Sequence, residues 1–236
     1  MSEIKADILA FGAHADDIEI GMGGTIAKFA RKGKTIVLCD LTKAELSSNG
    51  TVELRKKEAE LAGEILGVKE RINLELPDRG LFLTDEAIRK AATVIRKYRP
   101  SVVFAPVEMD RHPDHGQCSN IIREAFFSAG IRKYVTYGNE KSHKAGQLYF
   151  YMINGFHHPD FCVDITDYAQ EKQQALKAYK SQFTLGDGGV ETPLTNGYIE
   201  TVEARDRLMG KEVGVVYAEG FLSSKPLTLD EDLIGD

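Results

Sequence analysis

Strand-type apolar runs alternate with helix-period segments along the first 130 residues. Strands are expected at 7–13, 35–41, 71–76 and 101–105, and helices at 24–31, 51–66, 85–98 and 117–129. Strands separated by helices of this length favour right-handed crossovers and a parallel sheet that is covered on both faces. The alternation therefore predicts a Rossmann-like α/β core over residues 1–130.

The remaining residues, 131–236, are expected to extend this sheet. A polar stretch at 134–144 precedes expected strands at 148–153 and 161–165, helices at 168–183 and 196–209, and a last strand at 213–217. The glycine-rich segment 186–189 is read either as a surface turn or as a loop over a site. No linker or repeat is evident. We therefore expect one domain over 1–236, a mostly parallel sheet with helices on both faces, extended by C-terminal strands, helices and active-site loops.

Charge and composition exclude several functional classes. Thirty basic and thirty-six acidic residues give a net charge of −6, which repels a phosphate backbone and argues against a nucleic-acid partner. The sequence has no signal-peptide pattern and no apolar stretch of about 18 residues, so no membrane role is expected. Cys39, Cys118 and Cys162 are widely spaced and form no disulfide or zinc-knuckle pattern, which favours a reducing, cytoplasmic location.

Two histidine-rich motifs follow the first and fourth expected strands. The first is His14-Ala15-Asp16-Asp17 and the second is His112-Pro113-Asp114-His115. In a doubly wound sheet the first and fourth strands are neighbours where the strand order reverses, and ligands bind outside their carboxyl ends. The two motifs are therefore expected to meet in one site.

The residue types in these motifs suit a catalytic metal. Imidazole nitrogen and carboxylate oxygen bind zinc, and catalytic zinc takes three protein ligands, which His14, Asp17 and His115 would supply. Attack by the activated water still needs a base outside the metal's ligands, and Asp16 is adjacent. Each motif alone reads equally well as a capped helix start, so the prediction depends on their joint placement.

Three further positions near these motifs have alternative readings. His112 is expected to stabilise an oxyanion as an imidazolium held by Asp114. Arg55 interrupts the apolar face of the helix at 51–66, which implies either an anionic substrate group or a structural ion pair. Asp78-Arg79, after the third strand, reads mainly as a β-turn.

At this point the sequence resembles the LmbE-like, or PIG-L-like, zinc deacetylases. The likeness is carried by Ala13–Glu19 and Arg111–His115, and it covers nearly the whole chain. Segments 46–51, 77–80, 153–157 and 217–221 resemble the branch that deacetylates N-acetylglucosaminyl-malate in bacillithiol biosynthesis. Ala15 stands where the family commonly has proline, which leaves every expected ligand in place.

The resemblance implies removal of acetate from an N-acetylglucosaminide, most specifically N-acetylglucosaminyl-L-malate. It implies zinc on His14, Asp17 and His115, Asp16 as general base and acid, and His112 with Asp114 at the oxyanion. Substrate binding would then fall to Arg55, Arg111 and Tyr198, the last approaching the acetyl oxygen from the late loop. A homo-oligomer is also implied, with a hexamer as one form.

Several alternatives remain open from the sequence. The aglycone could belong to a chitooligosaccharide, an inositol conjugate or a thiol S-conjugate, and iron, manganese or cobalt could replace zinc. A nucleotide-dependent oxidoreductase is suggested by glycines 21–24 and Asp40, although the glycine spacing and the nearby carboxylates argue against it. A non-catalytic zinc module would need a fourth ligand such as Cys118.

Overall fold

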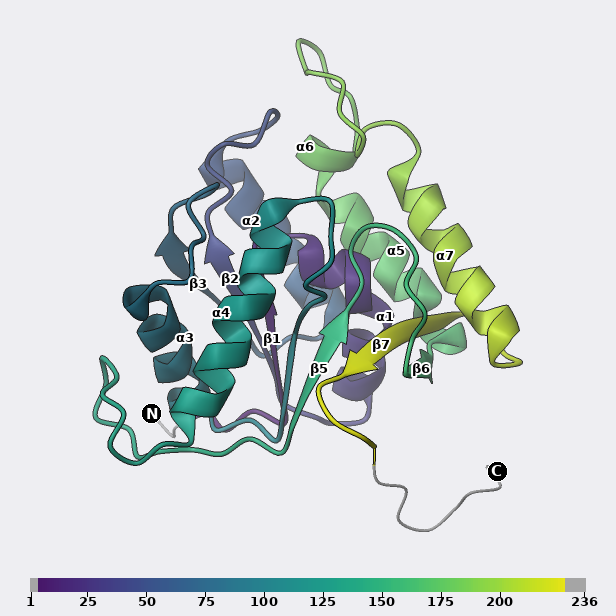
Figure 1. Ribbon diagram of the computed structural model, residues 1–236. Coiled ribbons are helices and arrows are strands. Elements are labelled where there is room, and N and C mark those ends of the chain that lie inside the picture. Colours follow the sequence, from purple (N-terminus) through teal and green to yellow (C-terminus); the bar gives the residue numbers. More distant parts are fainter. Residues whose placement is uncertain (1–3, 228–236) are drawn as a thin grey trace.

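The computed structural model describes residues 4–227, which contain a seven-stranded sheet in the order β3-β2-β1-β4-β5-β7-β6 (Figure 1). Its strands are β1 (Ile8–Gly12), β2 (Ile36–Thr42), β3 (Glu70–Leu76), β4 (Val102–Pro106), β5 (Gln147–Tyr151), β6 (Phe161–Asp164) and β7 (Ala218–Ser223). The predicted α/β class is confirmed.

Parallel pairing joins the first five strands. For the first four of them, the sequence predicted this parallel arrangement. β1 lies between β2 and β4, with Ile8 opposite both Ile36 and Val102. β7 runs antiparallel between β5 and β6, a reversal that the sequence did not indicate. Because β1 and β4 are neighbours, the loops that follow them open at the same edge of the sheet.

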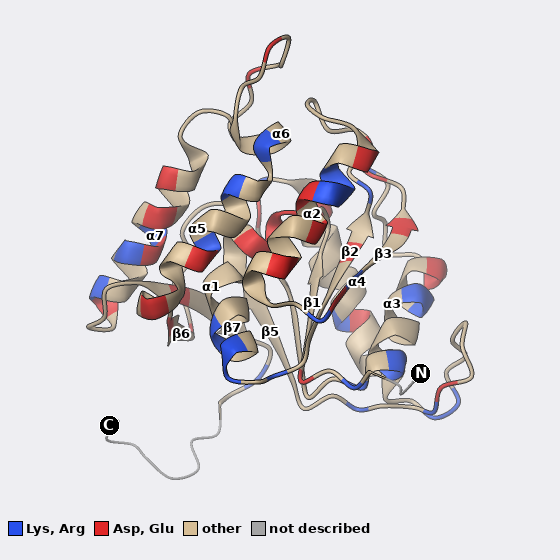
Figure 2. Ribbon diagram, turned by 180° about the vertical axis from the view of Figure 1, so that it is seen from behind, with Lys and Arg blue, Asp and Glu red and all other residues tan. Residues whose placement is uncertain are grey.

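Helices cover both faces of the sheet. Helices α3 (Asp85–Tyr98) and α4 (Pro113–Ala129) pack on one face, and α1 (Asp17–Arg31), α2 (Val52–Leu66) and α5 (Ala169–Ala178) pack on the other (Figures 1 and 2). Alternation along β1 explains this arrangement, since Leu9 and Phe11 enter one apolar cluster while Ile8 and Ala10 enter the other. Short elements η1 (Thr166–Tyr168) and α6 (Lys180–Phe183) precede α7 (Tyr198–Glu212), which packs beside β7.

Helix α1 starts seven residues earlier than the sequence pattern predicted. The backbone kinks at Met22, and the carboxylate of Glu219 accepts the Gly24 and Thr25 N–H groups at 2.9 and 2.7 Å, capping the second half of the helix. Gly21 lies against the ring of Tyr151, where an added Cβ would come within 2.1 Å of a ring carbon. Gly21 therefore permits close packing inside the helix and does not form a turn. The sequence pattern alone does not show this packing, so it predicted a helix start at residue 24.

Other boundaries also differ from the expectations. Helix α4 begins at Pro113, not at residue 117, with His112 as its N-cap. The helix expected at 168–183 divides at Tyr179, whose hydroxyl donates to Glu19 at 2.8 Å and whose backbone leaves the helical region. The last strand is β7, not 213–217, because the chain turns at Gly214 with a positive φ of 78°. Within residues 4–227, no helix is both long and apolar enough to cross a membrane.

Candidate active site

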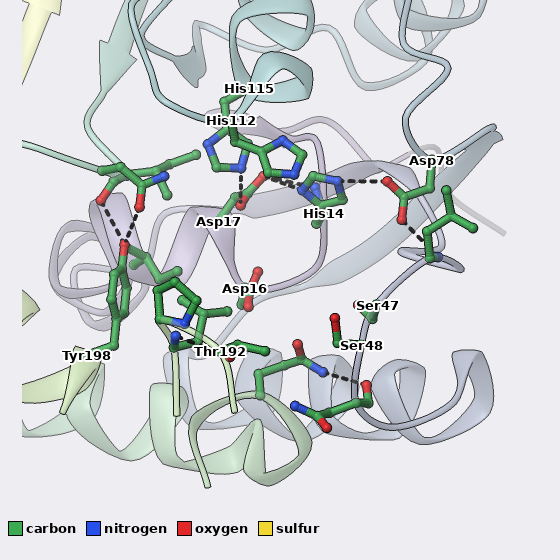
Figure 3. A pocket seen from close by; sticks show the side chains of 18 of the residues that line it. His14, Asp16, Asp17, Ser47, Ser48, Asp78, His112, His115, Thr192 and Tyr198 are labelled. Carbon is green, nitrogen blue, oxygen red and sulfur yellow. Dashed lines mark hydrogen bonds and ion pairs between the residues drawn. The ribbon is translucent and has the colours of Figure 1, made fainter. Parts of the chain in front are cut away.

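The two histidine-rich motifs meet at the carboxyl ends of β1 and β4, as the sequence predicted (Figure 3). The first motif forms the turn between β1 and α1, and the second forms the start of α4. Asp17 closes the first turn because its Oδ2 accepts the His14 N–H at 2.9 Å. Asp16, the N-cap of α1, takes φ 120°, a left-handed conformation that costs a non-glycine residue about 1–3 kcal/mol.

A compact group of donor atoms surrounds Asp17. Its Oδ1 lies 3.1 Å from His115 Nε2, and its Oδ2 lies 3.6 Å from His14 Nδ1. The ring of His112 stacks on that of His115 at a centroid distance of 4.7 Å. Nitrogen atoms of His14, His112 and His115 all lie within 4.8 Å of one another. The structure therefore brings together the three predicted ligands and places His112 beside them.

The protonation of this group follows from its buried charges. Burial alone would raise the pKa of Asp17, but the charge of His115 and hydrogen bonds from both histidines hold it well below its usual range. Burial lowers the pKa of His115, but the Asp17 charge and contacts with Asp110 raise it to about 9. Carboxylate contacts likewise raise the pKa of His14 despite burial. A cation at this position would therefore compete with protons on the two rings.

This donor set fits a divalent metal. Two imidazoles and a carboxylate, all buried, converge from the β1–α1 turn and the start of α4, and the oxygen atoms of Asp17 lie near one nitrogen of each ring. Buried titratable groups clustered in a pocket are typical of functional sites. Cys118 is fully buried and does not belong to the groups of potential ligands found among the described residues, so the sequence's structural reading of this thiol agrees with its placement.

The rings of His14 and His115 each contact a further carboxylate through the nitrogen that does not face Asp17. Asp78 Oδ1 lies 3.2 Å from His14 Nε2, and Asp110 Oδ1 lies 2.9 Å from His115 Nδ1. From sequence alone, Asp78 is expected in a turn and Asp110 has no assigned role. Both residues lie in loops that follow strands at the same edge of the sheet, and this position is the signal that could have identified them.

Asp16 and Arg55 form a buried ion pair at the pocket floor. Arg55 Nη2 lies 2.9 Å from Asp16 Oδ2, and Arg55 Nε donates to the Ala15 carbonyl at 2.8 Å. Burial raises the pKa of Asp16 to about 7, although the Arg55 charge opposes the shift. Arg55 therefore forms the structural ion pair that the sequence allowed as an alternative to substrate binding. The anion in this pair is Asp16, the expected general base.

His112 differs from the expectation of a charged ring held by Asp114. Its Nδ1 accepts the Asp114 backbone N–H at 3.3 Å, and its pKa is lowered by burial and by the charges of His14 and His115. The Asp114 carboxylate instead contacts Arg79. It accepts the Arg79 backbone N–H at 2.7 Å and pairs with the Arg79 guanidinium at 3.0 Å. A ring nitrogen that accepts an N–H carries no proton, so this contact and the lowered pKa favour a neutral imidazole for His112 over the expected imidazolium.

The expected substrate-binding residues Tyr198 and Arg111 both line the pocket. The Tyr198 hydroxyl lies 2.9 Å from Asn154 Oδ1 and 3.2 Å from the Ile153 carbonyl, so it is engaged with the protein. Arg111 is exposed at the rim, and no ion pair to its guanidinium occurs within the part of the chain that the structure describes. Arg111 is therefore available to an anionic group.

The pocket that holds these residues has a volume of about 440 Å³, within the range of small-molecule sites. Its walls come from the loop before α2, the loop after β3 and the segment before α7 (Figure 3). Hydroxyl and amide side chains also line the pocket: Ser47, Ser48, Asn49, Asn154, Gln182 and Thr192. Such groups suit a polyhydroxylated ligand.

The structure contradicts the dinucleotide reading. The glycine run lies inside α1, away from the β1–α1 turn, and Arg71 occupies both oxygens of Asp40 at 2.7 and 2.8 Å. Asp40 is therefore buried in a bidentate ion pair and not exposed to a ribose hydroxyl, and the turn itself presents the carboxylates of Asp16 and Asp17 where a pyrophosphate would bind.

Comparison with known proteins agrees with this geometry. A family model described as PIG-L, GlcNAc-PI de-N-acetylase, matches residues 9–126, half of the chain, and spans both histidine motifs. The chain belongs to the PIG-L deacetylase family. Diacetylchitobiose deacetylase of Thermococcus kodakarensis is 32% identical over 227 residues, covering 90% of this chain and 81% of that protein. A probable N-acetyl-alpha-D-glucosaminyl L-malate deacetylase 2 of Bacillus anthracis is 24% identical over 219 residues, covering 85% and 92%.

Solved structures share the whole architecture of this family member. A conserved protein from Thermus thermophilus matches with a TM-score of 0.87 and 38% identity, covering 96% of this chain and 98% of that one. N,N'-diacetylchitobiose deacetylase from Pyrococcus horikoshii, complexed with an inhibitor, matches with a TM-score of 0.81 and 25% identity, covering 92% and 84%. The fold is therefore that of the family.

Proposed function

We propose that this chain is a metal-dependent deacetylase that hydrolyses the acetamide of an N-acetylglucosamine conjugate. The observation that carries the proposal is the placement of Asp16 in the same pocket as the His14, Asp17 and His115 cluster. Deacetylation requires an activated water, a base and a donor for the oxyanion, and this pocket contains side chains suited to each task. Family membership supports the same reaction class.

Zinc is the metal that the donor set favours, held by His14, Asp17 and His115. Two nitrogen ligands and one carboxylate leave a position for water, and ferrous iron is a compatible alternative. When bound, such an ion lowers the pKa of its water and polarises the acetyl carbonyl.

Asp16 is the proposed general base. Its carboxylate is buried, is not needed as a ligand and has a pKa of about 7, so it can accept a proton near neutral pH. The proton from the attacking water passes to Asp16 and then to the amine nitrogen as the C–N bond breaks. Arg55, 2.9 Å away, holds the carboxylate in place.

His112 is the proposed donor to the acetyl oxygen. With Nδ1 accepting the Asp114 backbone N–H, the ring of a neutral His112 carries its proton on Nε2. A neutral imidazole can donate this N–H to a developing oxyanion without itself being charged. This proposal differs from the sequence-based expectation of an imidazolium but keeps the same role for the residue.

For the substrate we propose N-acetylglucosaminyl-L-malate, which would place the chain in bacillithiol biosynthesis. Exposed Arg111 at the rim has no ion pair among the described residues, and malate carries two carboxylates. A neutral diacetylchitobiose is the second candidate, favoured by the relative from Thermococcus kodakarensis.

A substrate panel tests both parts of this proposal. Acetate release would be measured with N-acetylglucosaminyl-malate, diacetylchitobiose and an inositol conjugate, using protein loaded with zinc or with ferrous iron. We expect the malate conjugate to have the highest kcat/KM. No acetate release from any of the three with either metal would refute the deacetylase.

Arg111→Gln separates the two substrates. We expect its KM for the malate conjugate to rise about 10-fold, because a charged hydrogen bond is lost, with little change for diacetylchitobiose. Arg132→Gln, at an exposed position outside the pocket lining, is the matched control. An equal effect of Arg111→Gln on both substrates would argue against recognition of the malate carboxylates.

We also propose a homo-oligomer in a reducing cytoplasm. Large apolar side chains are exposed beside α3 and α4, among them Phe127 at 72% and Val135 at 64%, and Cys39, Cys118 and Cys162 are free thiols. Light scattering would measure the assembly state. A monomer at micromolar concentration would refute the oligomer.

A further inference from the structure

A continuous set of contacts leads from helix α7 to the predicted ligand His115. The Tyr198 hydroxyl donates to Asn154 Oδ1 at 2.9 Å, and Asn154 Nδ2 donates to Asp110 Oδ1 at 2.9 Å. The same Asp110 oxygen lies 2.9 Å from His115 Nδ1. Figure 3 shows Tyr198 on the opposite side of the pocket from Asp78.

Asp110 is held more tightly than a surface carboxylate. Its side chain is 0% exposed, Oδ2 accepts the Asn154 backbone N–H at 3.0 Å, and Oδ1 also accepts the His112 backbone N–H at 2.8 Å. The His112 backbone N–H and the backbone and side-chain N–H groups of Asn154 therefore hold the carboxylate in place independently of His115. Oδ1 also lies 2.9 Å from His115 Nδ1, as an ion pair.

The position of Asp110 determines which nitrogen of His115 is free. Nδ1 faces the Asp110 carboxylate, while Nε2 faces Asp17 Oδ1 at 3.1 Å. A carboxylate at Nδ1 retains the proton there and leaves the lone pair of Nε2 for a metal. Loss of such a partner behind a metal-binding histidine typically costs 10–100-fold in metal affinity.

Asn154 connects Asp110 to α7, and its amide must face one way. The NH₂ group and the backbone N–H both donate to Asp110, so the amide oxygen points away and accepts the Tyr198 hydroxyl. A flipped amide would place its oxygen against the Asp110 carboxylate, leaving two acceptors in contact. The Tyr198 O–H therefore favours the orientation that supports Asp110.

We propose that Asp110 is a positioning residue for His115, and that Asn154 and Tyr198 hold Asp110 in place. This inference rests on the proposed metal site. It gives Tyr198 a role through the protein, whereas the sequence resemblance implied contact with the acetyl oxygen.

Metal affinity and the visible spectrum of the cobalt-substituted protein test the proposal without measuring turnover. Cobalt(II) would be titrated against a competing chelator into wild type, Asp110→Asn, Asn154→Ala and Tyr198→Phe. We expect a 10–100-fold loss of affinity and a changed cobalt absorption band for Asp110→Asn, and a smaller loss for Asn154→Ala. Tyr198→Phe should weaken cobalt binding severalfold.

Two matched controls accompany these variants. Glu108→Gln changes a carboxylate two residues from Asp110 that is 61% exposed, and Tyr217→Phe removes a hydroxyl that contacts Glu203, within α7. Both should bind cobalt as wild type does. Asp110→Glu, which keeps the charge, should recover part of the affinity lost in Asp110→Asn.

The outcomes separate this inference from the proposed function. Wild-type affinity and an unchanged spectrum in Asp110→Asn would overturn the positioning role, even if wild type deacetylates. A Tyr198→Phe variant with lower kcat but unaltered cobalt affinity would instead support direct contact with substrate and overturn its place in this set. If Asp110→Asn does not fold by circular dichroism, Asn154→Ala carries the test. Wild type that binds no cobalt, zinc or iron would refute the metal site itself.

Discussion

Arg55 Nη2 lies 2.9 Å from Asp16 Oδ2. The arginine that interrupts the apolar face of α2 is therefore paired with the proposed general base. Both side chains are almost completely buried, at 7% and 4% exposure. A buried carboxylate needs such a partner to be ionised at neutral pH, because burial alone favours its protonated form. The pair thus links the packing of α2 to the chemistry of the β1–α1 turn.

Asp16→Asn should remove deacetylation without removing the metal. The amide cannot accept the proton from water, so we expect kcat to fall by about 10²–10⁴, while zinc content stays near that of wild type. Acetate release and metal analysis on the same preparation would measure both. Asp167→Asn, an exposed carboxylate outside the pocket lining, is the control. Undiminished kcat in Asp16→Asn would rule out Asp16 as base.

Metal content of three variants should identify the ligands. Asp17→Ala and His115→Ala are expected to lose the metal, because each removes a proposed ligand from a set of three. His112→Ala should retain it and lose about 10²–10³ in kcat, because it removes only the oxyanion donor. The nitrogen atoms of all three histidines lie within 4.8 Å, so a metal-free His112→Ala would instead favour a site of three histidines.

The metal-free protein should lose stability as pH rises from 6.5 to 9. The folded-state pKa of His115 is about 9, above its ordinary value of 6.5, so its contribution is fully present below 6.5 and is lost as pH rises through 9. We expect the free energy of unfolding to fall by on the order of 2–3 kcal/mol across this window. Urea denaturation with a chelator at both pH values would measure it. His115→Gln should make this pH dependence smaller, leaving the contribution of His14, whose pKa is also raised, and an unchanged slope in that variant would contradict the assignment.

Metal affinity should rise with pH, whereas the stability of the metal-free protein should fall. A protonated imidazole cannot bind a cation, so the apparent zinc affinity should rise between pH 6.5 and 9 and protons should be released on binding. Calorimetry in buffers of different ionisation enthalpy would count these protons. Affinity that is constant over the range would exclude His115 as a ligand.

Glu219→Ala should destabilise the fold strongly. This carboxylate caps the second half of α1 through Gly24 and Thr25 and lies 2.7 Å from the buried ammonium of Lys172. Removing it leaves orphan N–H groups and weakens the pairing of a buried charge, a loss of about 3–5 kcal/mol. Glu60→Ala, whose ion pair with Lys56 is exposed, should cost under about 1 kcal/mol. Equal unfolding midpoints for the two variants would contradict this role.

Much of the fold could be predicted from local patterns. The first four strands and the helices between them follow apolar periodicity, which is a property of neighbouring residues. The start of α1 could not be predicted in this way, because Gly21 is read as a helix breaker unless the ring of Tyr151 is known to pack against it. β7 was misplaced for a similar reason, since its pairing partners β5 and β6 are distant in sequence.

The sequence by itself determined where the candidate site lies and that both histidine motifs meet there, because a parallel sheet brings strand ends together whatever their separation along the chain. Only the tertiary structure decided the state of each group. The partner of Arg55, the N–H that His112 accepts and the carboxylate beside His115 depend on which atom faces each side chain. Those atoms come from other loops, and proton positions respond to distances of a few ångströms.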